Sequence, residues 1–275
     1  MLKYLMKYEI KFIWKKLLIV LGVMLLVTAA CAAAYGLLGK ANFHDDESQM
    51  ILAMLVYFAY YSIIVCVPFA AVIIIGVRFF KNVFGDEGYI TNTLPVTGRQ
   101  ILWAKIIVNT VVMLIVSVAL VVSMLFVLPA MIFAVDVNAA AELNDLMTVI
   151  TSDIGYSLGK LAVIFFVDLV IGAISNVLNV YGAVCIGQCW KRYKGVGAVV
   201  SYILITIALA ILGTVITLPV VVNSITAENS VNTAANIGTG LFDNIMLWSA
   251  GLSIVFAAIM YLIVDHRMTK KLNLE

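Results

Sequence analysis

The sequence predicts an all-α membrane protein with six transmembrane helices, an amphipathic helix at the N-terminus and a cytoplasmic helix between spans two and three. Three observations lead to this fold class. Hydrophobic residues make up 64% of the chain and charged residues 12%, whereas a soluble domain is closer to half apolar and a quarter charged. The mean hydropathy is +1.12. The apolar residues are also collected into long runs, several of which exceed the roughly 20 residues that cross a bilayer.

Residues 1–16 are expected to form a separate unit at the start of the chain. Lys3, Lys7, Lys11 and Lys15 recur every fourth residue and therefore share one face of a helix. Leucine, phenylalanine, tryptophan and tyrosine occupy many of the other positions. This pattern predicts an amphipathic helix that lies in the membrane interface, with its lysines at anionic lipid headgroups.

Six apolar runs follow, and we interpret each as a membrane span. The first run is too long for the apolar core of a cleaved signal peptide, so we expect it to be retained. The predicted spans are about 17–39, 51–77, 106–134, 161–189, 197–222 and 246–265. The outer connection at 223–245 has room for a short re-entrant or interfacial helix. Residues 1–275 are therefore predicted to form a single transmembrane domain.

The distribution of Lys and Arg gives these spans a direction. An even number of spans puts both termini on one side, and the side richer in Lys and Arg is the cytoplasmic one. Fifteen of the 17 Lys and Arg residues lie in the N-terminus, in segments 78–105 and 190–196, and in the C-terminal tail. The opposite side has only Lys40 and Lys160. We therefore expect both termini in the cytoplasm.

The cytoplasmic segment 78–105 is the most distinctive part of the chain. Pro95 cannot continue a helix, and it disfavours helical geometry at Leu94. Thr97 and Gln100 then have the spacing of a capping box, in which a hydroxyl residue is followed three residues later by Glu or Gln. The segment is therefore predicted to contain a short helix, a break, and the start of the helix that becomes span three.

The short helix in this segment has a mixed surface, with Phe84, Tyr89 and Ile90 expected to be exposed among charged residues. Such a surface, held just below the membrane, would suit docking onto a soluble protein. An ordinary solvated connection between two spans explains the same residues equally well.

The segment also resembles the first cytoplasmic loop of ABC-2-type transporter permeases. The resemblance rests on an acidic residue followed by Glu-Gly-Tyr and, a few residues later, by Leu-Pro-Val-Thr, Gln, Ile-Leu and Lys. In this sequence the matching residues are Asp86, Glu87, Gly88, Tyr89, Leu94, Pro95, Val96, Thr97, Gln100, Ile101, Leu102 and Lys105. Residues 86–105 alone carry the motif, whereas the rest of the chain agrees with the family in topology only.

The resemblance implies the permease subunit of an ATP-driven exporter in a bacterial plasma membrane. The cargo would be hydrophobic or amphipathic, with a peptide or an antibiotic preferred. In this family the N-terminal amphipathic helix is an elbow helix, and the segment between spans two and three is a coupling helix that docks into a groove of the ATPase. The coupling residues would be Asn82, Phe84, Gly85, Asp86, Glu87, Gly88, Tyr89, Thr93, Leu94, Pro95 and Arg99.

The implied partners are ABC ATPase subunits, a second copy of the chain or a close relative, and the lipid bilayer, but not nucleic acid. A P-loop needs Gly-x-x-x-x-Gly-Lys-Ser/Thr, and the stretches that end near Lys40 and Lys160 lack this glycine spacing and the final hydroxyl. ATP and Mg are therefore expected on the partner ATPase. With four cysteines in apolar runs and only two histidines, we expect no disulfide framework, no metal site and no catalytic residues.

Asp168 is the only acidic residue well inside a span. Small and polar residues follow it at helical spacing: Gly172, Ser175, Asn176 and Asn179. We expect this face either to line a translocation path together with Asp168, or to pack against a neighbouring helix or a second copy. Lipid-like side chains occupy the other face: Ile164, Phe165, Val170, Ile174 and Val177.

Two other functions are compatible with the sequence. A secondary transporter or channel would use Asp168 as a proton or cation site and would need an ion gradient instead of an ATPase. A non-transporting membrane anchor would recruit a soluble partner through segment 78–105. An ATPase that co-purifies with the chain would distinguish the exporter from both alternatives.

Overall fold

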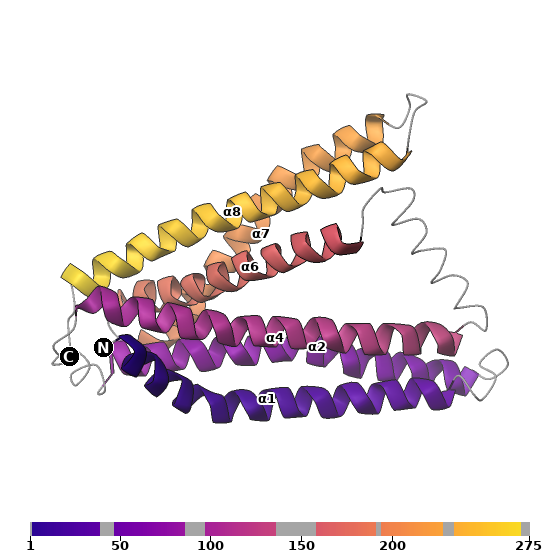
Figure 1. The fold of residues 1–275 in the computed structure, drawn as a ribbon, viewed down its shortest axis with the longest axis horizontal. Coiled ribbons are helices and arrows are strands. Elements are labelled where there is room, and N and C mark those ends of the chain that lie inside the picture. The colour runs from indigo at the N-terminus through magenta and orange to yellow at the C-terminus, as the bar shows by residue number, and fades with distance from the viewer. Residues whose placement is uncertain are drawn as a thin grey trace. The chain divides into compact units, whose positions relative to one another are not determined.

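The computed structural model describes residues 2–38, 47–85, 97–135, 158–190, 194–227 and 234–270, and α-helix is the only regular structure in these ranges. The helices are α1 (Leu2–Leu38), α2 (Glu47–Val83), α4 (Gly98–Val135), α6 (Leu158–Gly187), α7 (Lys194–Ala227) and α8 (Ala234–Lys270) (Figure 1). Each contains a stretch that is long and apolar enough to cross a membrane. The predicted all-α fold with six membrane-type helices is therefore confirmed.

The helices are longer than the spans that hydropathy predicts. They contain between 30 and 38 residues, or roughly 45–57 Å at ~1.5 Å per residue. Hydropathy marks only the apolar part of a helix, and polar residues continue it outside the hydrocarbon layer. As a result α1 is one continuous helix over residues 2–38, and a separate elbow helix is not shown. Likewise α8 begins at Ala234, inside the predicted outer connection.

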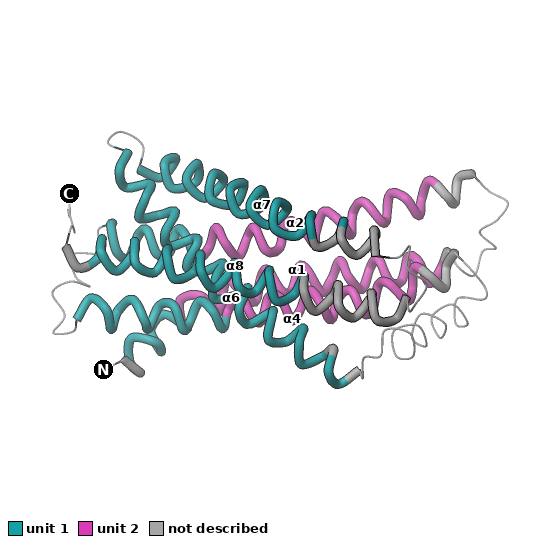
Figure 2. Tube along the Cα trace, turned by 90° about the horizontal axis from the view of Figure 1, so that it is seen from above, with its two compact units in different colours: residues 1–9, 75–111, 150–275 teal, residues 10–74, 112–149 magenta. Residues whose placement is uncertain are grey.

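Contacts between residues group the chain into two compact units (Figure 2). Unit 1 contains residues 1–9, 75–111 and 150–275, and unit 2 contains residues 10–74 and 112–149. Helices α1, α2 and α4 each contribute a part to both units, whereas α6, α7 and α8 belong to unit 1. The predicted single transmembrane domain thus contains two regions of dense contact.

A chain of hydroxyl groups connects α1, α2 and α4 within unit 2. Thr28 Oγ1 donates to the carbonyl oxygen of Met24 at 2.7 Å. Ser123 Oγ lies 2.9 Å from Thr28 Oγ1 and 3.0 Å from the hydroxyl oxygen of Tyr60. Since the Thr28 proton is already donated, Ser123 donates to Thr28 and Tyr60 donates to Ser123. Polar side chains thereby join three helices where lipid offers no hydrogen-bond partner.

Within unit 1, glycines let α6 and α7 approach until their backbones touch. A Cβ atom at Gly187 would lie 2.3 Å from the backbone nitrogen of Ala198, and one at Gly197 would lie 2.8 Å from the carbonyl oxygen of Gly187. The atoms in the way belong to the backbone and cannot rotate aside. This contact between the end of α6 and the start of α7 therefore requires glycine.

We expect Gly187→Ala to lower the free energy of unfolding by about 1–3 kcal/mol, which is the usual effect of overpacking a close contact. Gly195→Ala is the matched control, because a Cβ atom at Gly195 meets nothing within 4 Å. Thermal unfolding of the two variants in the same detergent measures the difference. Equal melting temperatures would contradict the close contact between α6 and α7.

Candidate functional site

The predicted coupling residues surround the end of α2 and the start of α4. Asn82 belongs to the last turn of α2, Phe84 and Gly85 follow that helix, and Arg99 lies in the first turn of α4. The others lie outside the described residues: Asp86, Glu87, Gly88, Tyr89, Thr93, Leu94 and Pro95. Residues 78–83 continue α2, so within the described part of segment 78–105 there is no separate short helix.

The chain leaves α2 through a tight turn at Phe84 and Gly85. The N–H groups of both residues donate to the carbonyl oxygen of Phe80, at 2.9 and 3.1 Å. A Cβ atom at Gly85 would lie 2.8 Å from the carbonyl oxygen of Lys81, so this turn favours glycine. Phe84 is half-buried, and its ring meets the Phe79 ring edge-on with centroids 6.2 Å apart. The prediction that Phe84 is exposed is therefore wrong, because Phe79 offers it an apolar contact.

The start of α4 has one half of the predicted capping box. The Thr97 N–H donates to Oε1 of Gln100 at 3.4 Å, which satisfies a backbone donor at the helix start. Arg99 binds Asp265 of α8 through two hydrogen bonds of 3.0 Å, from Nε to Oδ1 and from Nη2 to Oδ2. The Arg99 side chain is 67% exposed, so this pair lies at the surface of unit 1.

A buried ion cluster joins the ends of α2 and α4 to the start of α1. Oε2 of Glu9 accepts a hydrogen bond from Nε of Arg78 at 3.3 Å, and Oε1 accepts one from Nζ of Lys105. All three side chains are at most 9% exposed. Because Arg78 lies in α2 and Lys105 in α4, both ends of segment 78–105 are bound to one carboxylate. Separating them would leave buried charges without this partner, which is costly.

Tyr181 of α6 extends this cluster. Its ring stacks on Phe79 with centroids 3.9 Å apart and planes 15° from parallel. Its hydroxyl donates to the carbonyl oxygen of Lys105 at 3.2 Å and accepts from Nδ2 of Asn109 at 2.5 Å. The side chain is fully buried, so the two hydrogen bonds satisfy a hydroxyl that water cannot reach. Tyr181 thereby fixes α6 to the same ends of α2 and α4.

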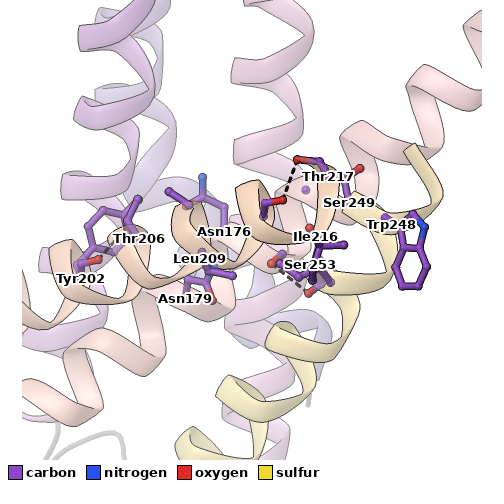
Figure 3. A pocket seen from close by; sticks show the side chains of 15 residues that line it. Asn176, Asn179, Tyr202, Thr206, Leu209, Ile216, Thr217, Trp248, Ser249 and Ser253 are labelled. Carbon is purple, nitrogen blue, oxygen red and sulfur yellow. Dashed lines mark hydrogen bonds between the residues drawn. The ribbon is translucent and has the colours of Figure 1, made fainter. Parts of the chain in front are cut away.

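A pocket of about 440 Å³ lies among α6, α7 and α8 of unit 1 (Figure 3). Of the residues predicted to line a translocation path, Ser175, Asn176 and Asn179 line this pocket. The other lining residues are Gly172, Tyr202, Thr206, Leu209, Ala210, Gly213, Ile216, Thr217, Trp248, Ser249, Leu252 and Ser253. All of them are uncharged. Ser175 Oγ also donates to the Ser253 carbonyl oxygen at 3.3 Å, so the polar face of α6 both packs against α8 and lines the pocket.

Asp168 is not among the lining residues. It is half-buried, and within the described part of the chain it makes no hydrogen bond or ion pair. The expectation that the opposite face of α6 is lipid-like is partly wrong. Phe165 and Ile174 are 44% and 36% exposed, but Val177 is completely buried. The buried side of α6 is wider than its polar stripe, because α6 packs against several helices of unit 1.

No family model, no curated protein and no solved structure matches the chain. The case for a function therefore rests on the residues themselves.

Sequence reasoning missed Glu9 and Tyr181. Glu9 is the only acidic residue before Asp45, and it stands inside a lysine-rich helix, which was the available signal for a buried ion pair. Tyr181 gave no such signal, because an apolar run does not reveal which of its aromatic residues faces other helices. For the two cations of the buried cluster the sequence predicted less. Arg78 was used only to predict the orientation of the spans, and Lys105 was included in the motif without a predicted role.

Proposed function

We propose that the chain is the permease subunit of an ATP-driven exporter of the ABC-2 type, which works with a separate ATPase. The observation that carries the proposal is the motif that runs from Asp86 and Glu87 to Lys105. Six helices of membrane-spanning length and composition agree with it. The Lys and Arg distribution supports cytoplasmic termini, with segment 78–105 on the side of the ATPase. The resemblance implies a bacterial plasma membrane.

The buried cluster at the base of this segment supports a coupling role. In the proposed mechanism, closure of the ATPases pushes on a coupling helix between α2 and α4. Arg78 and Lys105 both bind Glu9, and buried ion pairs resist separation. The ends of α2 and α4 would therefore move together, and the push would tilt the two spans as a pair.

The start of α1 supports the proposed elbow helix. Lys7, Lys11 and Lys15 are exposed, and Tyr4 and Tyr8 are exposed by 79% and 78%. Exposed lysines and tyrosines on one helix suit the headgroup region of a bilayer. Two copies of the chain, or one copy and a close relative, would pair with two ATPase subunits. The proposed cargo is a hydrophobic or amphipathic molecule, preferably a peptide or an antibiotic.

Affinity purification of the tagged chain from native membranes in a mild detergent tests this proposal. We expect an ABC ATPase to co-purify in equal numbers, and its ATP hydrolysis to be stimulated when the complex is placed in nanodiscs. The matched control is the ATPase purified without the permease. A folded chain that repeatedly purifies without any ATPase would contradict the proposal.

Asp168→Asn is expected to leave ATP-dependent transport unchanged, because Asp168 lies outside the pocket and has no ion-pair partner among the described residues. A secondary transporter that used this carboxyl group as a proton site would lose transport instead. Uptake of a labelled apolar peptide into inverted vesicles distinguishes the two, with an ionophore present to collapse the proton gradient. Transport that is lost both in the variant and with the ionophore would favour the secondary transporter.

A further inference from the structure

Two pairs of side chains connect the start of α4 to the end of α8 within unit 1 (Figure 1). Arg99 binds Asp265, and one helical turn further along α4 the Trp103 ring meets the Tyr261 ring with centroids 5.5 Å apart. Residues four positions apart lie on the same face of a helix. One face of α4 therefore meets one face of α8 through these four side chains.

The ion pair has a geometry that fixes both partners. Its two hydrogen bonds use both carboxylate oxygens of Asp265, each at 3.0 Å. A bidentate pair of this kind sets the orientation of the guanidinium plane as well as its distance. The Asp265 side chain is only 15% exposed, so its charge is partly removed from water and gains most from an adjacent cation.

Arg99 stands where a helix alone does not favour a cation. The first turn of a helix carries a partial positive charge, so acidic side chains are stabilising there and basic ones are not. Arg99 lies in the first turn of α4, which contains no acidic residue. The stability of α4 therefore does not explain this arginine, whereas the carboxylate of Asp265 on α8 does.

The end of α8 is in contact with α6 as well. A Cβ atom at Gly182 of α6 would lie 2.5 Å from Sδ of Met260 and 3.3 Å from its Cβ, so the Met260 side chain fills the space that this glycine leaves. Met260, Val264 and Met268 are buried and follow one another at intervals of one turn. The end of α8 thus contacts α4 through one face and α6 through a neighbouring face.

We infer that Arg99 is a positioning residue, which binds the end of α8 to the start of α4 and acts through Asp265. The resemblance to ABC-2 permeases implies a different role, in which Arg99 docks the ATPase. Because Arg99 belongs to segment 78–105, a displacement of this segment would carry α8 along with α2 and α4. That consequence rests on the proposed function, whereas the bond between α4 and α8 needs no ATPase.

Hydrogen exchange of the full chain in nanodiscs tests the bond between the helices. Arg99→Ala should let the backbone amides of residues 262–268 exchange about fivefold faster, which is the scale of one partly exposed ion pair. Arg99→Asp combined with Asp265→Arg restores the pair with its charges reversed, and it puts an acidic side chain where the first turn of α4 favours one. Exchange in this combined variant should return to that of the unmodified chain. The amides of residues 202–217 in α7 are the internal control.

ATP hydrolysis by the co-purified ATPase distinguishes positioning from docking. Arg99→Asp alone should lower the stimulated rate about fivefold in either role, because it breaks the pair and reverses the charge. The combined variant should recover the rate if Arg99 positions α8, but not if Arg99 docks the ATPase, since position 99 remains acidic. Asp265→Arg alone should lower the rate as Arg99→Asp does, whereas docking would survive it because Arg99 is still present.

Three results would overturn the inference. Unchanged exchange at residues 262–268 in Arg99→Ala would show that the pair does not hold α8. Equally faster exchange at residues 202–217 would show general loosening and not the loss of one bond. A rate that stays low in the combined variant, or that survives Asp265→Arg, would assign Arg99 to docking. If no ATPase co-purifies with the unmodified chain, the proposed function fails, and hydrogen exchange still decides whether Arg99 positions α8.

Discussion

Glu9→Ala is expected to lower the free energy of unfolding by about 3–5 kcal/mol, because it removes the carboxylate that two buried cations share in a medium of low dielectric. Glu9 is the carboxylate that binds both Arg78 and Lys105, and these side chains are at most 9% exposed. Without it, two buried cations would remain close together. We therefore expect less folded protein in the membrane and a lower melting temperature in detergent.

Asp265→Ala is the matched control for this change. It removes the carboxylate that binds Arg99, whose side chain is 67% exposed while that of Asp265 is 15% exposed. Because water screens the Arg99 charge, we expect a smaller loss of stability than for Glu9→Ala. Thermal unfolding in one detergent compares the two variants directly. If Glu9→Ala were as stable as Asp265→Ala, the buried cluster would not be what holds the ends of α1, α2 and α4 together.

Charge reversal at Asp86 and Glu87 is expected to abolish ATP-dependent transport and to leave membrane insertion intact. Both residues belong to the motif that resembles the docking loop of ABC-2 permeases. Lysine at both positions would reverse the charge that the proposed ATPase partner meets, and like charges brought together across an interface cost several kcal/mol. Transport into inverted vesicles and co-purification of the ATPase measure the effect, and the amount of chain in the membrane fraction shows whether insertion is retained.

The same reversal at Asp45 and Asp46 provides a control on the other side of the membrane. These two acidic residues are also adjacent, but the Lys and Arg distribution predicts that they lie outside the cytoplasm. Their reversal should leave ATPase binding unchanged. If transport survived the change at Asp86 and Glu87, the coupling assignment would be wrong. If the reversal at Asp45 and Asp46 abolished ATPase binding as the reversal at Asp86 and Glu87 does, then the change in net charge would be responsible, and not the position of the charges.

The sequence predicted those features that depend on local patterns. Each span must be apolar along its whole length, so hydropathy was sufficient to predict six membrane helices. The contact between Thr97 and Gln100 was predictable because a capping box involves residues three positions apart. The polar face of α6 was predictable for the same reason, since Ser175, Asn176 and Asn179 recur at helical spacing. The start of α8 at Ala234 was not, because polar residues outside the hydrocarbon do not end a helix.

Contacts between distant residues could not be predicted in this way. Glu9 is 69 positions from Arg78 and 96 from Lys105, and no local pattern connects them. From the sequence, Asp168 was also expected on the same polar face as Asn176 and Asn179, because the three residues recur at helical spacing on a single helix. Which of them faces the pocket depends on where α7 and α8 pack, and the packing leaves Asp168 out.

The contact between Gly187 and Gly197 has a consequence for the distant pocket. The pocket lining on α7 ends at Thr217, which lies about 30 Å along the helix from Gly197 at ~1.5 Å per residue. A helix acts as a stiff rod over this length, so each degree of rotation about the glycine contact moves Thr217 by about half an ångström. A single methyl group at Gly187 would therefore widen or narrow the pocket without touching it. By the same geometry, a molecule that binds one angle between α6 and α7 more tightly than another would shift the equilibrium toward that angle.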